Sequence, residues 1–546
     1  MTIREIETDG WRVRLDTSKQ LLGVEVPEFV YGRGSSSGFG DLLPTLPLPG
    51  DGPVSAATLL LKAKQFDDGL LAVVELAAQR GIGRLPGKAG LLRSLAEALS
   101  HDPAATPILT ACRLGQVAVM VPETLNAAVR HAADQFLGDE LASKPLGFYR
   151  WSPDLEAVFR QDRFLQRPLD PTDADKVVAA IGRVAGGWSA YDAILALASR
   201  MTNALDTPSL RDGGDERAFL PASRSHEVVL FNRMYGDKPV PDGFNLMTEL
   251  IRCVRTGEID LRPNEQSGLY DHQTWSLEPL IRPDTVSEAP QLALGGRYRQ
   301  HLEDLFRGAL ALARETHVKQ VGGGYGGYAG PRVQPVYVGP DLSTEPVPTV
   351  YARRAEVYRF LREVLGWAFG DGWQQLHRLT ADGPVEKRLG EELDQFVKLF
   401  NEAAAASYRE LGLEPPSGTV ENAGEFNAWR TGLSNDPDVA RDARMMVPVF
   451  HDVGRKKTKV WAFLGWRTVP VDVEYRKEPT VLAVESARPQ GPAPAESPPV
   501  RFFGVRYEFA VPVTAELYVT RLLDRDEFRR HCDRHRTRAA ILRHLG

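Results

Sequence analysis

The most regular pattern of hydrophobic positions lies between Gly295 and Lys319. Apolar residues recur there at steps of three and four: Tyr298, Leu302, Leu305, Phe306, Ala309, Leu312 and Ala313. This spacing places them on one face of an α-helix. His317 and Lys319 fall in the last turn, where positive charge suits the helix dipole, and Gly322 follows as a stop signal. We expect a central amphipathic helix around which other helices pack.

Helical periodicity extends over most of the chain. The clearest predicted helices are 70–80, 88–99, 122–136, 188–203, 244–254, 349–367 and 386–411. Ser152, Pro153 and Asp154 have the residue types of a helix start: a hydroxyl cap, a proline at the first position and an acid in the first turn. These signals predict a body made of helices.

Both ends of the chain have a different pattern. Trp11, Val13 and Leu15 alternate with charged residues, which is typical of a half-buried strand. Near the other end, strands are predicted at 447–450, 460–464, 468–473, 480–484 and 501–520, followed by one closing helix over 524–545.

These patterns divide the chain into three segments. Residues 1–54 are rich in strands and loops, 55–444 form a helical body, and 445–546 form an α+β section with a proline-rich loop at 487–499. The predicted fold class is therefore mostly α with a mixed α+β C-terminal section, its helices packed around the helix near 295–319.

Composition favours a cytoplasmic protein. The 546 residues carry a net charge of −6 and 43% hydrophobic residues, enough for a large core without a basic footprint for nucleic acid. Three widely spaced cysteines exclude a Cys-x-x-Cys site and favour a reducing compartment. The N-terminus lacks the apolar run of a signal peptide, and no stretch reaches the roughly 20 apolar residues of a membrane span.

Two glycine motifs match known sites in letters alone. Gly322-x-Gly324-x-x-Gly327 resembles a dinucleotide fingerprint, but that mechanism needs a strand before the glycines and a helix after them. Gly34-x-Ser36-x-Gly38 resembles a nucleophile elbow, but prolines follow where a helix is required. We interpret both as turns, and no cofactor can be assigned.

A polar and aromatic cluster is the preferred ligand-binding wall. Tyr270, His272 and Trp275 precede the central helix, and Tyr325 and Tyr328 follow it. Such side chains line ligand clefts, but they also occur in buried packing with their polar tips bonded. Both alternatives remain open at this point.

Catalytic residues cannot be assigned from spacing. His272, His317, His451 and Asp452 are the residues to watch, because a hydrolase could bring them together from distant segments. His451 and Asp452 are equally compatible with a structural role at a strand end.

The C-terminal helix offers the nearest metal-type spacing. Glu527, His531 and His535 are four residues apart and share one helical face. From Arg521 onward, however, eight arginines against four acids leave a surplus of four positive charges, which disfavours a cation. We expect no metal, and a solvated helix that could contact an anionic partner.

Several runs in the same order resemble the uncharacterised bacterial and archaeal domain-of-unknown-function family thirty-one-sixty. The runs are Phe148-Tyr149, Arg233 to Asp237, Leu277-Glu278-Pro279-Leu280, Ala293-Leu294-Gly295, Glu345 to Pro348, Gly504 to Phe509 and Arg521 to Asp524. The family's Thr-Thr-Asp run before paired histidines is missing here. The resemblance implies a helical body with late strands and no catalytic residue.

The sequence thus supports two functions of different classes. The first is an accessory protein that binds a small molecule or another protein, since no complete catalytic constellation is present. The alternative is a hydrolase whose active site forms from distant segments. Convergence of the histidines with a carboxylate would favour the enzyme, and scattered histidines would favour the binding protein.

Overall fold

The computed structural model describes residues 2–8, 11–28, 42–83, 85–223, 225–236, 238–241, 243–319, 338–416, 424–452, 454–486 and 500–545. The helices are α1 (Ala56–Arg80), α2 (Lys88–Ala98), α3 (Ala105–Leu114), α4 (Glu123–Gly138), α5 (Glu140–Ser143), α6 (Pro153–Leu165), α7 (Pro171–Arg183), α8 (Gly187–Met201), α9 (His226–Met234), α10 (Leu246–Thr256), α11 (Leu269–Leu277), α12 (Gly296–Thr316), α13 (Pro348–Phe369), α14 (Leu389–Glu410), α15 (Gly424–Gly432), α16 (Arg525–Arg534) and α17 (Arg538–Arg543). The strands are β1 (Ile3–Thr8), β2 (Trp11–Asp16), β3 (Leu21–Glu25), β4 (Leu292–Leu294), β5 (His377–Thr380), β6 (Gly383–Arg388), β7 (Met445–Asp452), β8 (Lys457–Lys477), β9 (Thr480–Ser486) and β10 (Val505–Val519). The predicted combination of abundant helices with strands near both ends is confirmed.

The two ends of the chain share their sheets. One sheet has the order β10-β8-β3-β4, and β7 also pairs with β8. A second sheet has the order β1-β2-β9, and β5 and β6 form a hairpin. Because β3 pairs with β8 and β2 with β9, the first and last predicted segments are joined by backbone hydrogen bonds.

The long strand β8 separates two clusters of apolar side chains. Val460, Ala462 and Leu464 pack in a small cluster with residues of α16 and α17, whereas Trp461 and Phe463 belong to the main core. Side chains that alternate between the two faces of a strand produce this division. The strands predicted separately at 460–464 and 468–473 are one strand, which continues through a bulge where Gly465 has φ +142°.

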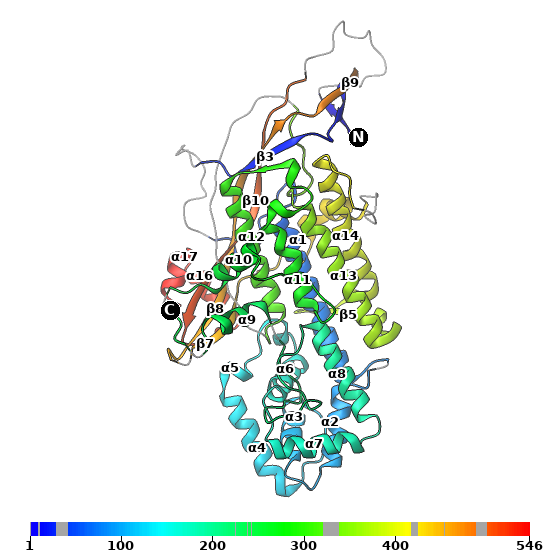
Figure 1. Cartoon of the computed structure of the whole chain (residues 1–546), viewed down its shortest axis with the longest axis vertical. Coiled ribbons are helices and arrows are strands. Elements are labelled where there is room, and N and C mark those ends of the chain that lie inside the picture. Colours follow the sequence, from blue (N-terminus) through cyan, green and yellow to red (C-terminus); the bar gives the residue numbers. More distant parts are fainter. Residues whose placement is uncertain are drawn as a thin grey trace.

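Helix α1 runs through the middle of the molecule and is buried along most of its length (Figure 1). The helix predicted over 70–80 is only its second half. The first half carries Lys64, Asp67 and Asp68 inside the protein, so its hydrophobic pattern is interrupted. Within the predicted segment 295–319, α12 covers Gly296–Thr316 and lies against α1, α11 and the β8–β10 pair. His317 and Lys319, predicted in its last turn, lie just beyond the helix, because the backbone leaves the helical conformation at His317.

The remaining helices surround α1 in separate groups. In Figure 1, α2, α3, α4, α6 and α7 gather at the lower end, α13 and α14 lie on one side, and β7, β8, α16 and α17 lie on the other. None of the described helices is long and apolar enough to cross a lipid bilayer.

The single closing helix predicted over 524–545 is wrong. The chain leaves the helical conformation at His535, where φ is −131° and ψ is 59°. Thr537 then starts α17 by accepting a hydrogen bond from the Ala540 backbone N–H. A threonine that caps a new helix competes with continuation of the old one.

A pair of glycine substitutions tests the close packing around α1. A Cβ atom at Gly69 would lie 2.2 Å from the Leu379 carbonyl oxygen of β5, whereas a Cβ at Gly90 of α2 meets nothing within 4 Å. Gly90→Ala should raise the free energy of unfolding by roughly 0.5–1 kcal/mol through helix propensity. Gly69→Ala should lower it by about 1–3 kcal/mol through overpacking, measured by urea denaturation. Equal stabilisation at both sites would contradict this packing.

Candidate functional site

A partly open cavity of about 100 Å³ lies where α1, α2, α6 and α8 meet the segment after α12. Helix α1 contributes Leu71, Val74, Glu75 and Ala78, and α8 contributes Ile194, Leu197, Ala198 and Met201. Both sets have the spacing i, i+3, i+4 and i+7, so each helix presents one continuous stripe to the cavity. Leu85, Leu205 and Leu220 complete an apolar wall.

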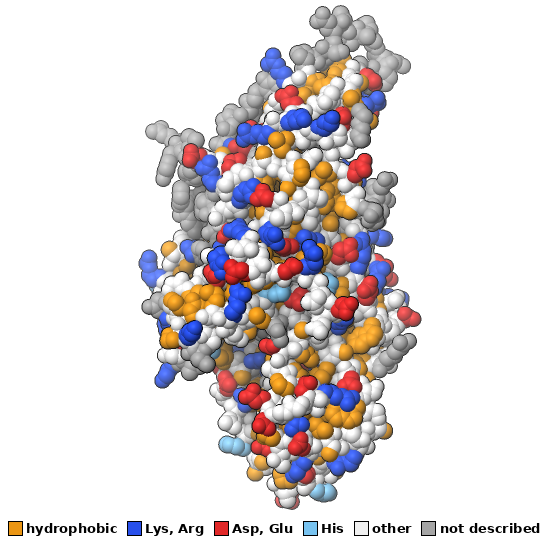
Figure 2. Space-filling model, in the orientation of Figure 1, with side chains coloured by type: hydrophobic (Ala, Val, Ile, Leu, Met, Phe, Trp, Pro, Cys, Tyr) orange, Lys and Arg blue, Asp and Glu red, His pale blue; other side chains and the backbone are white. Residues whose placement is uncertain are grey.

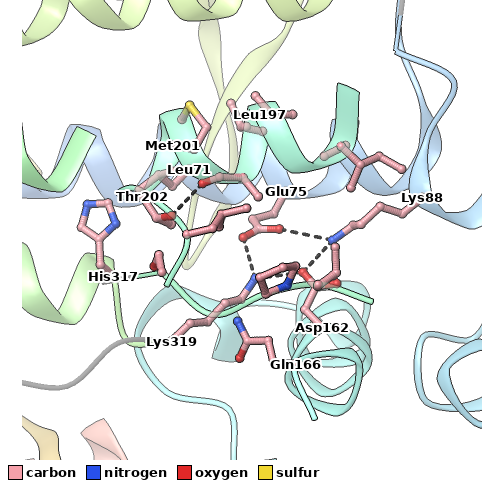
Figure 3. A pocket seen from close by; sticks show the side chains of 18 of the residues that line it. Leu71, Glu75, Lys88, Asp162, Gln166, Leu197, Met201, Thr202, His317 and Lys319 are labelled. Carbon is pink, nitrogen blue, oxygen red and sulfur yellow. Dashed lines mark hydrogen bonds and ion pairs between the residues drawn. The ribbon is translucent and has the colours of Figure 1, made fainter. Parts of the chain in front are cut away.

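A cluster of charged side chains forms one part of the cavity lining (Figure 3). The Lys319 ammonium lies 2.7 Å from Glu75 and 3.0 Å from Asp162. Lys88 lies 2.6 Å from Asp162 and 3.8 Å from Glu75. The Tyr149 hydroxyl donates a 2.6 Å hydrogen bond to Glu75, and Lys319 lies over the Tyr149 ring. We call Glu75, Lys88, Asp162 and Lys319 the four-charge cluster; it contains two positive and two negative groups.

The pKa shifts of Lys319 and Asp162 favour the charged form of each group. Burial alone would lower the pKa of Lys319, but Asp162 and Glu75 hold it well above its ordinary value. Burial would raise the pKa of Asp162, yet Lys319 and Lys88 bring it below its ordinary value. Burial, reinforced by Glu75, raises the pKa of Tyr149 well above its usual range, so Tyr149 keeps its proton and remains a donor.

His317 lines another part of the cavity, beside Thr202 and away from Lys88 (Figure 3). Its Nε2 lies 2.9 Å from Oε1 of Gln273, a residue of α11. Gln273 Nε2 donates a 2.8 Å hydrogen bond to Asp67 Oδ2, which also accepts from Arg354. Burial, together with the nearby charges of Arg314, Lys64 and Arg354, lowers the pKa of His317 well below its usual value. The imidazole is therefore neutral at physiological pH.

The other candidate catalytic residues lie outside this cavity. The His272 ring stacks on Phe360 at 3.9 Å between ring centroids, and burial lowers its pKa to about 4. His451 is exposed on β7, where its Nδ1 lies 3.1 Å from the Thr458 hydroxyl. Asp452 forms an ion pair with Arg455. Among the described residues, the structure does not bring His272, His317 and His451 together around one carboxylate.

The residues predicted to form one ligand-binding wall do not line the cavity together. Tyr270 is fully buried, and its hydroxyl donates a 2.9 Å hydrogen bond to Glu227 while its ring packs edge-on against His317. Trp275 is partly buried under the Arg353 guanidinium. Neither residue lines the cavity. Tyr325 and Tyr328, like the glycine motifs at 34–38 and 322–327, fall outside the described residues.

The helix-spaced residues near the C-terminus have structural partners. Glu527 completes a capping box with Asp524 and pairs with Arg521. His531 Nε2 lies 3.1 Å from the Ile541 carbonyl oxygen, and the His535 ring is 4.9 Å from the His531 ring. Within the described part of the chain, no group of three or more histidine, cysteine or acidic residues is arranged to hold a metal ion.

Sequence reasoning missed the four-charge cluster. The sequence pattern predicts Lys319 in the last turn of an amphipathic helix, where the helix dipole alone accounts for its charge. One signal was available: Glu75 lies within an apolar stripe, three or four residues from Leu71 and Ala78. A charge in such a stripe is either exposed at its edge or paired inside the protein, and the sequence does not show the partner.

A second hollow, of about 490 Å³, lies beside the start of α12. Arg255, Arg282 and Arg299 reach it from three segments. Each is already paired with a carboxylate: Glu303, Glu278 and Asp284, respectively. Its exposed, paired charges make it a weaker candidate than the cavity beside α1.

Comparisons with known proteins add no assignment to this geometry. No protein-family model, curated protein or solved structure matches the chain. The resemblance noted from the sequence stays a prediction.

The four-charge cluster can be tested by its effect on stability. Lys319→Met leaves Glu75 and Asp162 with only Lys88, so we expect a loss of about 3–5 kcal/mol in the free energy of unfolding. Adding Asp162→Asn restores the charge balance and should recover part of that loss. The control Lys398→Met, at an exposed position of α14, should leave stability unchanged. Urea denaturation of the four proteins measures these values; equal effects of Lys319→Met and Lys398→Met would show that the cluster does not stabilise the fold.

The neutral His317 predicts a specific pH dependence. Its folded-state pKa lies below the unfolded value of about 6.5, so the unfolded chain takes up a proton that the folded protein does not. The stability advantage of the wild type over His317→Phe should therefore shrink as pH falls below about 6.5, by up to about 1.4 kcal/mol per pH unit. Chemical denaturation from pH 7 to 5 measures it. An advantage that stays constant over this range would contradict a neutral buried imidazole.

Proposed function

We propose that this protein binds a small, uncharged molecule in the cavity beside α1, and that it acts as a cytoplasmic ligand-binding accessory protein rather than as a hydrolase. The observation that carries the proposal is an apolar cavity whose charged lining is already internally paired. Its volume of about 100 Å³ is comparable with the roughly 150 Å³ of an engineered apolar cavity that holds benzene. The ligand is accordingly about the size of one small ring.

The charge balance sets the chemical class of the ligand. Lys88 and Lys319 are matched by Glu75 and Asp162. A ligand carboxylate or ammonium group would bring an extra charge into a buried site where no counter-charge is left, at a cost of several kcal/mol. A neutral molecule meets the apolar stripes of α1 and α8 without that cost.

The other predicted roles receive less support. A hydrolytic site needs a base and a nucleophile within hydrogen-bond reach, and His317 faces Gln273 rather than a nucleophile.

The three described cysteines are free, in agreement with a reducing compartment. Arg530, Arg534, Arg536 and Arg543 are exposed near the C-terminus, so an anionic partner there stays a prediction. On the face seen in Figure 2, positive and negative side chains are intermixed.

Three ring compounds of similar size test the proposed ligand class. Benzyl alcohol should bind, whereas benzylammonium and benzoate should bind at least about 100-fold more weakly because each adds an unpaired charge. Ligand-observed NMR on the full chain, with calorimetry where affinity permits, measures the difference.

Two matched substitutions on α8 locate the binding site. Ala198 lines the cavity, whereas Ala196 is partly buried on the same helix but does not line it. Ala198→Leu should fill the cavity and abolish benzyl alcohol binding, and Ala196→Leu should leave it unchanged. No binding by the wild type, or equal binding of all three compounds, would overturn the proposed function.

A further inference from the structure

The hydrogen bonds behind His317 determine which of its ring nitrogens carries the proton. Asp67 Oδ2 accepts from Arg354, whose guanidinium has only donors. Burial raises the pKa of Asp67, but the ion pair with Arg354 favours the carboxylate. A carboxylate oxygen only accepts hydrogen bonds, so the amide nitrogen of Gln273 faces Asp67. The amide oxygen consequently faces His317, and an oxygen only accepts. His317 Nε2 must therefore carry the proton and donate it to Gln273.

The other nitrogen of the ring is left as an acceptor. A neutral imidazole has one N–H, so Nδ1 of His317 carries a lone pair. Among the described residues no donor lies within hydrogen-bond distance of this atom. Nδ1 of His301 is a fully buried atom without a hydrogen-bond partner. Nδ1 of His317 is not among the fully buried atoms without a partner. His317 is only 4% exposed, and it is one of the residues that line the cavity.

The groups around His317 also disfavour protonation of the imidazole ring, which would remove the lone pair on Nδ1. Arg314, Lys64 and Arg354 are the charged groups that act on the ring, and all three are positive. Tyr270 packs edge-on against it and keeps its own proton, because burial raises its pKa well above the usual range. A neutral ring with one N–H occupied and one lone pair free can accept one hydrogen bond from a molecule in the cavity.

We infer that Nδ1 of His317 is the hydrogen-bond acceptor for the cavity ligand, so that the protein selects uncharged molecules with an O–H or N–H group over equally apolar molecules without one. Gln273 is the positioning residue that holds the ring in the accepting tautomer. This inference rests on the proposed function and adds the polar group that its ligand must carry. A mostly apolar cavity that leaves an acceptor unpaired discriminates against a ligand that cannot donate to that acceptor.

Phenol and fluorobenzene form the pair that tests the inference. They have similar size, but only phenol donates a strong hydrogen bond. Phenol should bind the wild type about five- to tenfold more tightly, the factor expected for one neutral hydrogen bond. In His317→Phe the ring shape is kept and the acceptor is removed, so the preference should disappear. His272→Phe, at the neighbouring position of Gln273 on α11, should keep it.

The outcomes separate the two proposals. If neither compound binds the wild type, the proposed function fails. If both bind with equal affinity, the cavity binds ligands but His317 does not select them, and this inference is overturned. A preference that survives His317→Phe would overturn it as well.

The tautomer provides a readout that does not depend on any ligand. Nitrogen-15 NMR of histidine-labelled protein distinguishes a protonated Nε2 from a protonated Nδ1, and the His317 signal is identified by its loss in His317→Phe. The wild type should show protonated Nε2 and bare Nδ1. Gln273→Met should shift His317 toward a mixture of tautomers and reduce the preference for phenol. Protonated Nδ1 in the wild type would refute the inference even if a variant failed to fold.

Discussion

Every charge that α1 places inside the protein must meet a partner there, and this requirement organises the structure around that helix. Lys64, Asp67, Asp68 and Glu75 all point into regions with little solvent. An unpaired buried charge costs several kcal/mol. Their partners come from distant parts of the chain: Lys64 pairs with Glu315, Asp67 with Arg354, and Glu75 with Lys319. The ion pairs therefore fix α12, its continuation and α13 against α1.

The same helix separates regions of different chemistry along its length. Near its middle, Asp67 pairs with Arg354, and Lys64 pairs with both Asp68 and Glu315. One turn or more further along the helix, Leu71, Val74 and Ala78 line the cavity, and Glu75 is a member of the four-charge cluster. The cavity thus lies between these ion pairs and the four-charge cluster.

The sheets show how the chain ends are combined into one structure. β8 is buried on both faces in its first half because α16 and α17 cover one face and the main core covers the other. Further along, it pairs with β3 near the N-terminus, and β2 pairs with β9. Alternation of apolar residues identified many of these strands. It could not identify their partners, because any strand with an exposed edge has the same hydrogen-bonding groups.

By itself the sequence determined the local elements. Periods of two and 3.6, capping residues and glycine stops are local signals, and they located α12, most of the helices and the strands at both ends. Only the tertiary structure decided the site. It joined Glu75, Lys88, Asp162 and Lys319 into one balanced cluster, and it placed His317 against Gln273 while leaving His451 on an exposed strand. The physical reason is that periodicity records which face of an element is buried, whereas the partner of a buried charge or imidazole depends on contacts across the whole chain.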